Sequence, residues 1–288
     1  MNKPEVFPFY DQQTQSFSYV VKDPTSKSCA IIDAVLNFDY ASGGTSHEGA
    51  DEIIAHIKKH QLKVEWIIET HMHADHLTAA DYLKEKLGGT TAISKHIVEV
   101  QAIFTKVFNI ANEFTPDGSQ FDHLFADGEN YRIGNLQATA LYTPGHTPAC
   151  MTHLIGDSAF VGDTLFMPDV GTARVDFPGG DAHTLYESIQ QILRLPEDTR
   201  LFMCHDYPPE SREVEYETNV SAEKHHNIHV NINMSEEAFT QLRKNRDKTL
   251  GMPRLILPSL QINMRAGKLP KAENNALSYL KIPLNAFK

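Results

Sequence analysis

Short apolar runs bounded by turn-forming residues predict a series of β-strands, and longer stretches with apolar residues at helical spacing predict helices. The predicted strands cover residues 17–21, 28–33, 66–70, 131–133, 136–143, 151–155, 159–162 and 201–204. The predicted helices cover residues 48–60, 75–87, 96–108, 183–195 and 235–247. Residues 37–47, which are rich in Gly and Ser, predict a loop. This mixture of strands and helices is typical of an α/β protein.

The length of 288 residues allows one large domain with a smaller appendage. We expect residues 1–230 to form the main domain, and residues 231–288 to form a helical, Pro-rich cap packed on it. The cap carries apolar side chains that could support a homodimer, namely Leu255, Ile256, Leu257 and Leu260. The sequence contains no internal repeat and no low-complexity segment.

Charge and cysteine content argue against several classes of protein. The net charge is −11 and the 26 Lys and Arg residues are scattered, which argues against a nucleic-acid-binding surface. The apolar runs are too short to span a membrane, and the first residues lack the apolar core of a secretory signal. Three cysteines cannot form a disulfide framework, so we expect a reducing, cytoplasmic location. An anionic ligand would have to be held by local cations.

The segment His71-Met72-His73-Ala74-Asp75-His76 places four metal-binding side chains directly after a buried strand. Imidazole and carboxylate groups suit zinc, iron or manganese. Because we expect the next helix to begin at Asp75 or His76, the segment should connect the carboxyl end of a strand to the amino end of a helix. Active sites of α/β proteins commonly occupy this position.

Three further candidate ligands, His146, Asp163 and His205, also follow or close apolar runs. Each of them, taken alone, could be an ordinary capping or loop residue. Since all three stand at the ends of predicted strands, they should project from the same rim of a sheet as the four-ligand segment. The sequence therefore predicts one metal centre with seven candidate ligands.

The motifs His-x-His-x-Asp-His, Pro-Gly-His-Thr and Gly-Asp-Thr-Leu, followed by a late His, resemble the metallo-β-lactamase superfamily over residues 15–230. The resemblance implies a four-layer αβ/βα sandwich of the α/β (α+β) class, with metals on the rim between its two sheets. It also implies two metal positions that Asp163 would bridge. The first would be formed by His71, His73 and His146, and the second by Asp75, His76 and His205.

Flanking residues resemble one branch of this superfamily, the persulfide dioxygenases, also called sulfur dioxygenases. The similar segments are His71–Thr78, Pro144–Cys150, Arg174–Phe177 and His205–Tyr207, and residues 166–174 and 252–260 are similar to the bacterial β-lactamase-like hydrolase branch of that family. The resemblance implies oxidation of glutathione persulfide by O2 and water to sulfite and glutathione, with one Fe(II) per chain. The iron would be held by His71, His146 and Asp163, as two histidines and one carboxylate on one face.

Two other functions remain open at this point. A glyoxalase II-like thioesterase with two zinc ions would use all seven ligands and attack its substrate with a metal-activated hydroxide. A metal-binding module without catalysis is the third reading. The dioxygenase and the hydrolase differ in the role of the other four candidate residues. In a dioxygenase these would orient the iron ligands and waters, whereas in a hydrolase they would hold a second metal. These four are His73, Asp75, His76 and His205. Met72 departs from the human-type dioxygenases, which carry Cys there.

Substrate binding is expected to involve Arg174, because a guanidinium group pairs with a carboxylate through two parallel hydrogen bonds. The alternative for Arg174 is a surface ion pair with Asp176 or Asp181. Lys224 and Asn227 match a family segment that lies beside the glutathione site, so they are further candidates for substrate binding.

The expected catalytic set is Tyr207, Asp75 and His205, with Tyr207 placed to hydrogen-bond the substrate sulfur or oxygen. Cys204 adjoins His205, but neighbouring residues on a strand point to opposite faces. We therefore expect Cys204 to face the core, together with Cys29 and Cys150.

Overall fold

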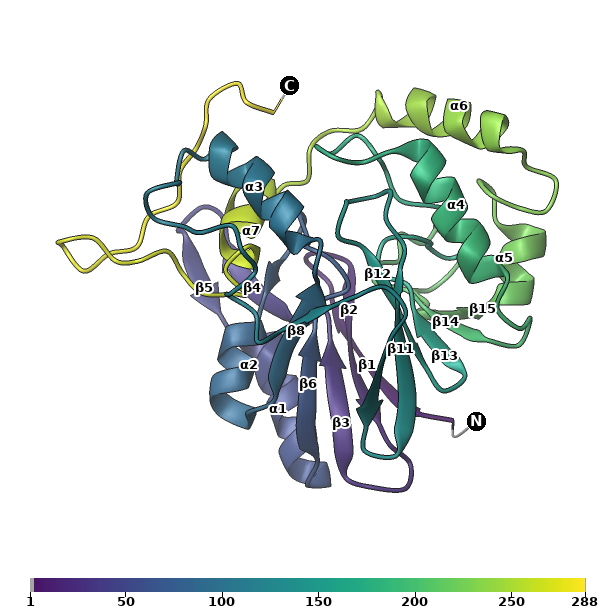
Figure 1. Ribbon diagram of the computed structural model, residues 1–288, viewed down its shortest axis with the longest axis horizontal. Helices are drawn as coiled ribbons and strands as arrows, with labels where there is room; N and C mark the ends of the chain where they lie inside the picture. Colours follow the sequence, from purple (N-terminus) through teal and green to yellow (C-terminus); the bar gives the residue numbers. More distant parts are fainter. Residues whose placement is uncertain (1–2, 288) are drawn as a thin grey trace.

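The computed structural model describes residues 3–287, so residues 1, 2 and 288, at the outer ends of the two predicted regions, lie outside it. Two six-stranded sheets pack face to face and carry helices on their outer sides, as Figure 1 shows. The first sheet has the order β1 (Glu5–Asp11), β2 (Ser16–Lys22), β3 (Ser28–Ile32), β6 (Lys63–Ile68), β8 (Thr90–Ser94), β9 (His123–Phe125). The second has the order β10 (Glu129–Ile133), β11 (Leu136–Tyr142), β12 (Met151–Ile155), β13 (Ser158–Phe160), β14 (Arg200–Phe202), β15 (Glu217–Asn219). The predicted αβ/βα sandwich is confirmed.

Alternation along the strands divides the apolar side chains between two cores. In β2, Tyr19 points into the core between the sheets, whereas its neighbour Val20 points to the core under the outer helices. Phe160 of β13 and Phe202 of β14 meet Tyr19 from the opposite sheet. Fully burying a large apolar side chain contributes roughly 1.5–3 kcal/mol, so this inner layer holds the two sheets together.

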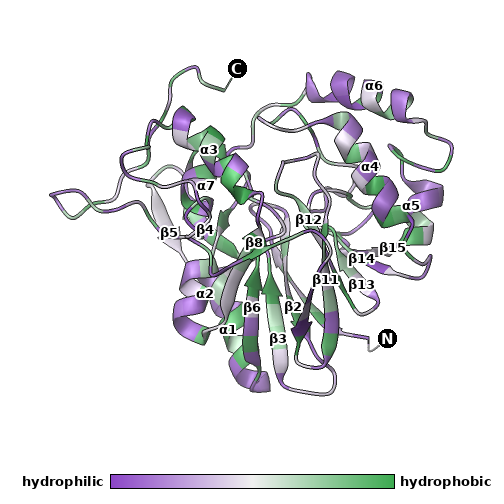
Figure 2. Ribbon diagram, in the orientation of Figure 1, coloured by the Kyte–Doolittle hydropathy of each residue, from purple (hydrophilic) through white to green (hydrophobic). Residues whose placement is uncertain are grey.

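The helices cover the outer faces of both sheets. They are α1 (Glu48–His60), α2 (Ala80–Leu87), α3 (Ile97–Val107), α4 (Ala182–Leu193), α5 (Val220–His226), α6 (Glu236–Asp247) and α7 (Ile256–Asn263). α1 and α2 pack on the first sheet, and α4 and α5 cover the second. Figure 2 shows the corresponding division, with hydrophobic strands in the middle and hydrophilic residues on the outer sides of α1, α2 and α6. No helix within residues 3–287 is long and apolar enough to cross a membrane.

The expected helix start at Asp75 or His76 is wrong. The ligand segment is instead followed by the short strand β7 (Leu77–Thr78), and α2 begins at Ala80. β7 pairs with β4 (Val35–Asp39), which in turn pairs with β5 (Gly44–Ser46) in a separate three-stranded sheet. β4 and β5 also occupy much of the predicted loop at 37–47, because tertiary pairing overrides the loop-forming composition.

The C-terminal region packs on the main body rather than standing apart. Phe239 of α6 is fully buried against Tyr186 of α4, and α7 lies against β7. The tail residues proposed to support a dimer do not form a free surface, since Leu255, Ile256 and Leu260 are buried in this chain's own cores. Beyond α7 the chain forms a loop away from the body, with exposed apolar side chains at Leu269, Leu277, Tyr279, Ile282 and Leu284. It then returns, since Lys281 bonds to Gln261 and Phe287 packs on Phe104.

Candidate metal centre and active site

The seven candidate ligands meet at one end of the two sheets. The loop after β6 supplies the four-ligand segment, and the ends of β11, β13 and β14 supply the other three. The ligand atoms form two neighbouring groups, in each of which all atoms lie within 4.8 Å of one another. The first group is His71, His146 and Asp163, and the second is His73, Asp75, His76 and His205.

Asp163 lies between the two groups. Its Oδ2 is 3.9 Å from Nε2 of His71 and 3.7 Å from Nε2 of His146. Its Oδ1 is 3.5 Å from Nε2 of His205, in the second group. One carboxylate therefore faces both groups, a geometry that suits either a terminal ligand or a bridge between two metals.

Hydrogen bonds at Nδ1 aim the Nε2 atoms of three histidines at the centre. Nδ1 of His146 is 2.8 Å from the carbonyl oxygen of Arg174, and Nδ1 of His71 is 3.0 Å from Oγ1 of Thr70. Nδ1 of His205 lies 3.1 Å from the carbonyl oxygen of Gln15. Such outer partners fix the ring orientation and leave the other nitrogen free for a metal.

His73 is held through its other ring nitrogen, Nε2. Its Nε2 lies 3.1 Å from Oδ1 of Asp33 and 3.3 Å from Oε2 of Glu69, and all three side chains are buried. Asp33 also accepts hydrogen bonds from the backbone and hydroxyl of Thr70, each at 2.8 Å. His73 therefore turns its Nδ1 toward the centre. Asp33 and Glu69 were not predicted as site residues, although Asp33 also closes an apolar run.

The unpaired atoms of this cluster fit a metal ion. Nε2 of His71, Nδ1 of His73, Nε2 of His76, Nε2 of His205 and Oδ1 of Asp163 are buried and have no hydrogen-bond partner among the described residues. Buried polar groups are normally paired, because an unpaired one costs about 1–3 kcal/mol. Five such atoms converging on one centre, with nitrogen and oxygen chemistry, match a site for zinc, iron or manganese.

The electrostatics of the two groups differ. Burial, together with His73 and His146, holds the pKa of His71 well below its usual value, so its lone pair is available at neutral pH. Burial alone would lower the pKa of His205, but the carboxylates of Asp75 and Asp163 raise it to about 9. Nε2 of His205 lies 3.0 Å from Oδ2 of Asp75. Without metal the second group thus contains an internal ion pair, and a metal binding there would displace its proton.

The loop that carries His146 depends on a glycine and on the C-terminal region. Gly145 has a φ of +135°, and a Cβ there would lie 2.4 Å from the backbone of Leu185 in α4. The carbonyl of Arg174 that accepts from His146 belongs to a loop held by α6. In that helix Asp247 accepts a hydrogen bond from the backbone N–H of Val175 at 2.9 Å and pairs with the buried Arg243.

α7 holds the four-ligand segment through Asn263, a residue that sequence reasoning missed. Its Nδ2 donates to the carbonyl oxygens of His73 and His76, both at 2.8 Å. Its Oδ1 accepts from the backbone N–H of Thr78, also at 2.8 Å. Asn263 is 3% exposed, so these three bonds are shielded from water. No local pattern in the tail distinguishes this asparagine from an ordinary helix residue.

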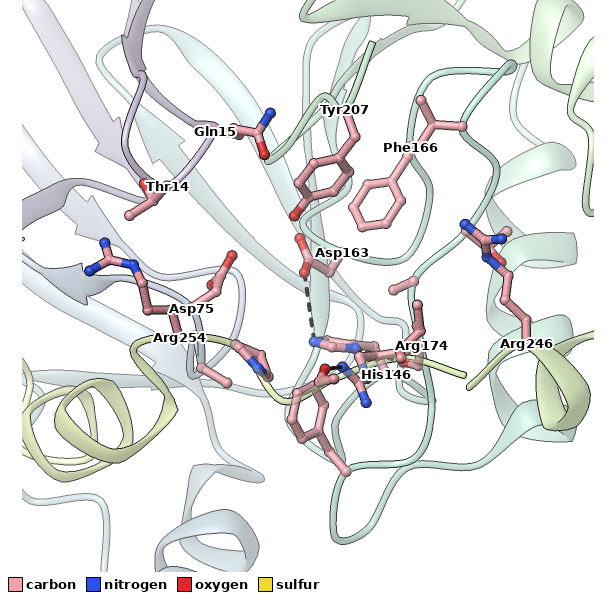
Figure 3. A pocket seen from close by; sticks show the side chains of 18 of the residues that line it. Thr14, Gln15, Asp75, His146, Asp163, Phe166, Arg174, Tyr207, Arg246 and Arg254 are labelled. Atoms are coloured by element: carbon pink, nitrogen blue, oxygen red, sulfur yellow. Dashed lines mark hydrogen bonds and ion pairs between the residues drawn. The ribbon is translucent and has the colours of Figure 1, made fainter. Parts of the chain in front are cut away.

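A cavity of about 600 Å³ opens above the ligands. Asp75, His146 and Asp163 line its floor, and Tyr207 lies over them, as Figure 3 shows. The Tyr207 ring is stacked on His205 with 5.7 Å between ring centroids. Desolvation of the hydroxyl and the charges of Asp75 and Asp163 raise the pKa of Tyr207, so it remains a hydrogen-bond donor at neutral pH.

The predicted substrate-binding residues lie in three different environments. Arg174 lines the cavity, but its guanidinium pairs with Asp176 through two bonds of 2.6 and 2.7 Å, which is the alternative arrangement predicted from the sequence. Lys224 lies outside the cavity and pairs with Glu197 at 3.6 Å. Asn227 is fully buried and bonds to the protein backbone, so neither Lys224 nor Asn227 reaches the ligands.

Cys204 does not simply face the apolar core. The chain leaves β14 at Phe202, so strict alternation no longer applies, and the buried sulfur lies within 4.8 Å of ligand atoms of Asp163 and His205. Burial and the surrounding carboxylates raise the pKa of Cys204 well above its usual value. Cys29 and Cys150 are buried as expected.

The chain is similar in sequence to one protein family and to several named proteins. Residues 11–205 match the model of the family described as "Metallo-beta-lactamase superfamily". The chain is 50% identical over 289 residues to a protein of Burkholderia pseudomallei (strain 1710b) named "Probable metallo-hydrolase", with 97% of this chain and 98% of that protein covered. It is 29% identical over 255 residues to the Homo sapiens protein named "Persulfide dioxygenase ETHE1, mitochondrial", with 88% and 84% covered.

The fold is similar to a solved structure described as ETHE1 from Myxococcus xanthus. The TM-score is 0.73 at 28% identity, and the match covers 92% of this chain and 100% of that chain. All seven candidate ligands lie within the range matched by the family model, whereas Tyr207 and Asn263 lie beyond it.

Proposed function

Because this chain belongs to the metallo-β-lactamase superfamily, we propose that its rim site binds one ferrous ion and acts as a persulfide dioxygenase. The reaction is glutathione persulfide plus O2 plus water giving glutathione plus sulfurous acid, which ionises to sulfite. Both oxygen atoms of O2 and one oxygen of water end on the outer sulfur, and the S–S bond breaks. The printed name of the human relative supports this reaction, and the ligand geometry supports the metal.

The observation that carries the proposal is the first ligand group. His71, His146 and Asp163 are buried and offer two imidazole nitrogens and one carboxylate within 4.8 Å. Two histidines and one carboxylate are the ligand set of non-haem Fe(II) oxygenases, in which the ion supplies open coordination positions and the redox chemistry. In the second group, Nε2 of His205 lies 3.0 Å from Oδ2 of Asp75, and we assign this pair to orienting the ring under Tyr207.

The protein's own residues then bind and orient the substrate. The Tyr207 hydroxyl stays protonated and donates a hydrogen bond toward the persulfide. The ion pair of Asp75 and His205 holds the ring under Tyr207 in place. His205 itself is fully buried and does not line the cavity, so of this pair only Asp75 faces the substrate. Phe166 and Phe177 line the cavity and limit access of water.

A two-metal hydrolase of the glyoxalase II-like thioesterase type is the second candidate. The chain retains His73, Asp75, His76 and His205 as a compact second group, and Asp163 faces both groups. The printed name of the Burkholderia relative, a metallo-hydrolase, agrees with this reading. In that case two zinc ions would activate a shared water for attack on a thioester.

Activity assays with two variants separate these candidates. Purified under anaerobic conditions, the protein should consume O2 with glutathione persulfide and should not hydrolyse S-lactoylglutathione. Asp163→Ala should lose bound iron and O2 uptake, whereas His76→Ala should retain the iron. Full O2 uptake by Asp163→Ala contradicts the proposed ligand set, and thioester hydrolysis without O2 uptake selects the hydrolase.

A further inference from the structure

The wall of the cavity above the ligands is rich in arginine. Four arginines line it, namely Arg174, Arg243, Arg246 and Arg254. Arg246 and Arg254 come from the end of α6 and from the segment that leads into α7, so they belong to the C-terminal region rather than to the range matched by the family model. This region therefore contributes directly to the surface that a bound ligand would touch.

Two of the four arginines are already neutralised by the protein. Arg243 is 1% exposed and pairs with Asp247 while donating to the carbonyl of Thr172. Arg174 pairs with Asp176, and its third bond, of 2.6 Å, goes to the carbonyl of Gly251. Both serve to hold the cavity wall together.

The other two arginines have no such partner. Arg246 and Arg254 are exposed, and neither forms an ion pair with any residue between 3 and 287. The wall carboxylate of Asp169, which could have balanced them, is held by Arg212 at 2.7 Å. The cavity thus presents two guanidinium groups that form no ion pair within the described residues, in a protein whose net charge is −11. The exposed carboxylate of Asp39 interacts with Arg254 only at longer range.

The placement of Arg246 and Arg254 suits a ligand with two separated anionic groups. Figure 3 shows Arg254 and Arg246 on opposite sides of Asp163 and His146, with the floor of the cavity between them. A ligand that reaches both would hold its central part over the metal ligands. Guanidinium groups favour carboxylates through paired hydrogen bonds, and a cavity of about 600 Å³ is of the size that binds small organic ligands.

We propose that Arg246 and Arg254 bind the two carboxylates of a peptide-sized thiol derivative and so centre its sulfur over Asp163 and His146. This inference rests on the proposed function, which supplies the thiol chemistry, but the arginine pair is tested separately by binding. Arg174, the cation expected from the sequence, would instead support the wall through Gly251.

Calorimetric binding of glutathione, and of its diethyl ester in which both carboxylates are blocked, to the metal-loaded protein tests whether Arg246 and Arg254 bind carboxylates. The native protein should bind glutathione at least about tenfold more tightly than the ester, since only the acid can form charge-assisted bonds. Arg246→Gln and Arg254→Gln should each weaken glutathione binding about tenfold and should not weaken binding of the ester, which has no carboxylate. Lys248→Gln, an exposed cation next to α6 that does not line the cavity, is the matched control and should have no effect.

Three outcomes would each refute the proposed binding role of Arg246 and Arg254. They are equal affinity of the native protein for acid and ester, unchanged glutathione affinity in both variants, or an equal loss with Lys248→Gln. The outcomes for the reaction are distinct. Arginine-dependent glutathione binding without persulfide-dependent O2 uptake supports the pair and refutes the dioxygenase. Persulfide-dependent O2 uptake with the same KM in the native protein and both variants overturns the pair and supports the dioxygenase.

Discussion

Replacing Asn263 by Ala tests how the C-terminal region supports the metal centre. The Asn263 side chain bonds three backbone groups of the ligand segment, at His73, His76 and Thr78. Alanine removes all three bonds and leaves two carbonyl oxygens and one N–H without a partner in a site shielded from water. The segment that carries four of the seven candidate ligands would then lose its attachment to α7.

The expected loss of stability in Asn263→Ala follows from the cost of leaving buried polar groups unpaired. Each buried polar group left without a partner costs about 1–3 kcal/mol, and a water entering the space would recover part of it. We therefore expect the free energy of unfolding to fall by about 3–6 kcal/mol in Asn263→Ala. Loss of outer support for metal ligands typically weakens metal binding by about 10–100-fold, and we expect a change of this size.

Gln261 in the same helix provides a matched control. It is also buried, and its Nε2 donates to the carbonyls of Leu257 and Lys281 while its Oε1 accepts from the N–H of Lys281. Gln261→Ala should cost similar stability without touching the ligand segment. Urea unfolding of the metal-free proteins gives the stability, and competition with a chelator gives the Fe(II) affinity. If both variants bind Fe(II) equally well, the positioning role of Asn263 is refuted.

Three further predictions concern pH, packing and thiol reactivity. Burial raises the pKa of Glu223 from 4.5 to about 8. Between these values the folded state holds a proton that the unfolded state lacks, so stability should fall as pH rises, by up to about 1.4 kcal/mol per unit. Glu223→Gln should remove this pH dependence of the unfolding free energy, measured by urea titrations from pH 5 to 8. An unchanged pH dependence would contradict the raised pKa of Glu223. Phe239→Ala should lower the unfolding free energy by about 3–5 kcal/mol in a single transition, whereas two transitions would mean that α6 is a separate unit. The buried thiols Cys29, Cys150 and Cys204 should resist alkylation in the native protein and react in urea, so rapid native labelling would contradict their burial.

The clustering of the seven candidate ligands could be predicted because their chemistry is local in the sequence. His71 to His76 form one segment, and His146, Asp163 and His205 each close an apolar run, so the sheet brings them to one rim. The same regularity predicts β2, β3, β6 and β10 to β14, but it misses β8, which lies between β6 and β9 in the first sheet. The short strands β5 and β7 escape prediction because only pairing with β4 makes them strands.

The supporting residues could not be predicted, because their partners are distant in the sequence. Asn263 bonds a segment nearly two hundred positions earlier, and Asp33, after β3, bonds His73, which follows the neighbouring strand β6. Arg174 is a different case, because both its predicted role in substrate binding and the alternative ion pair with Asp176 or Asp181 were open, and the structure shows the pair with Asp176. The pattern of charges along the chain gives the number of cations near a site, but only the fold shows which of them remain unpaired.

The most direct test of the proposed function is an anaerobic titration of the metal-free protein with Fe(II), followed by persulfide-dependent O2 uptake. If His71, His146 and Asp163 form the functional site, the rate should rise linearly and reach its plateau at one equivalent of iron per chain. A plateau that requires two equivalents of metal, with thioester hydrolysis in place of O2 uptake, would contradict it.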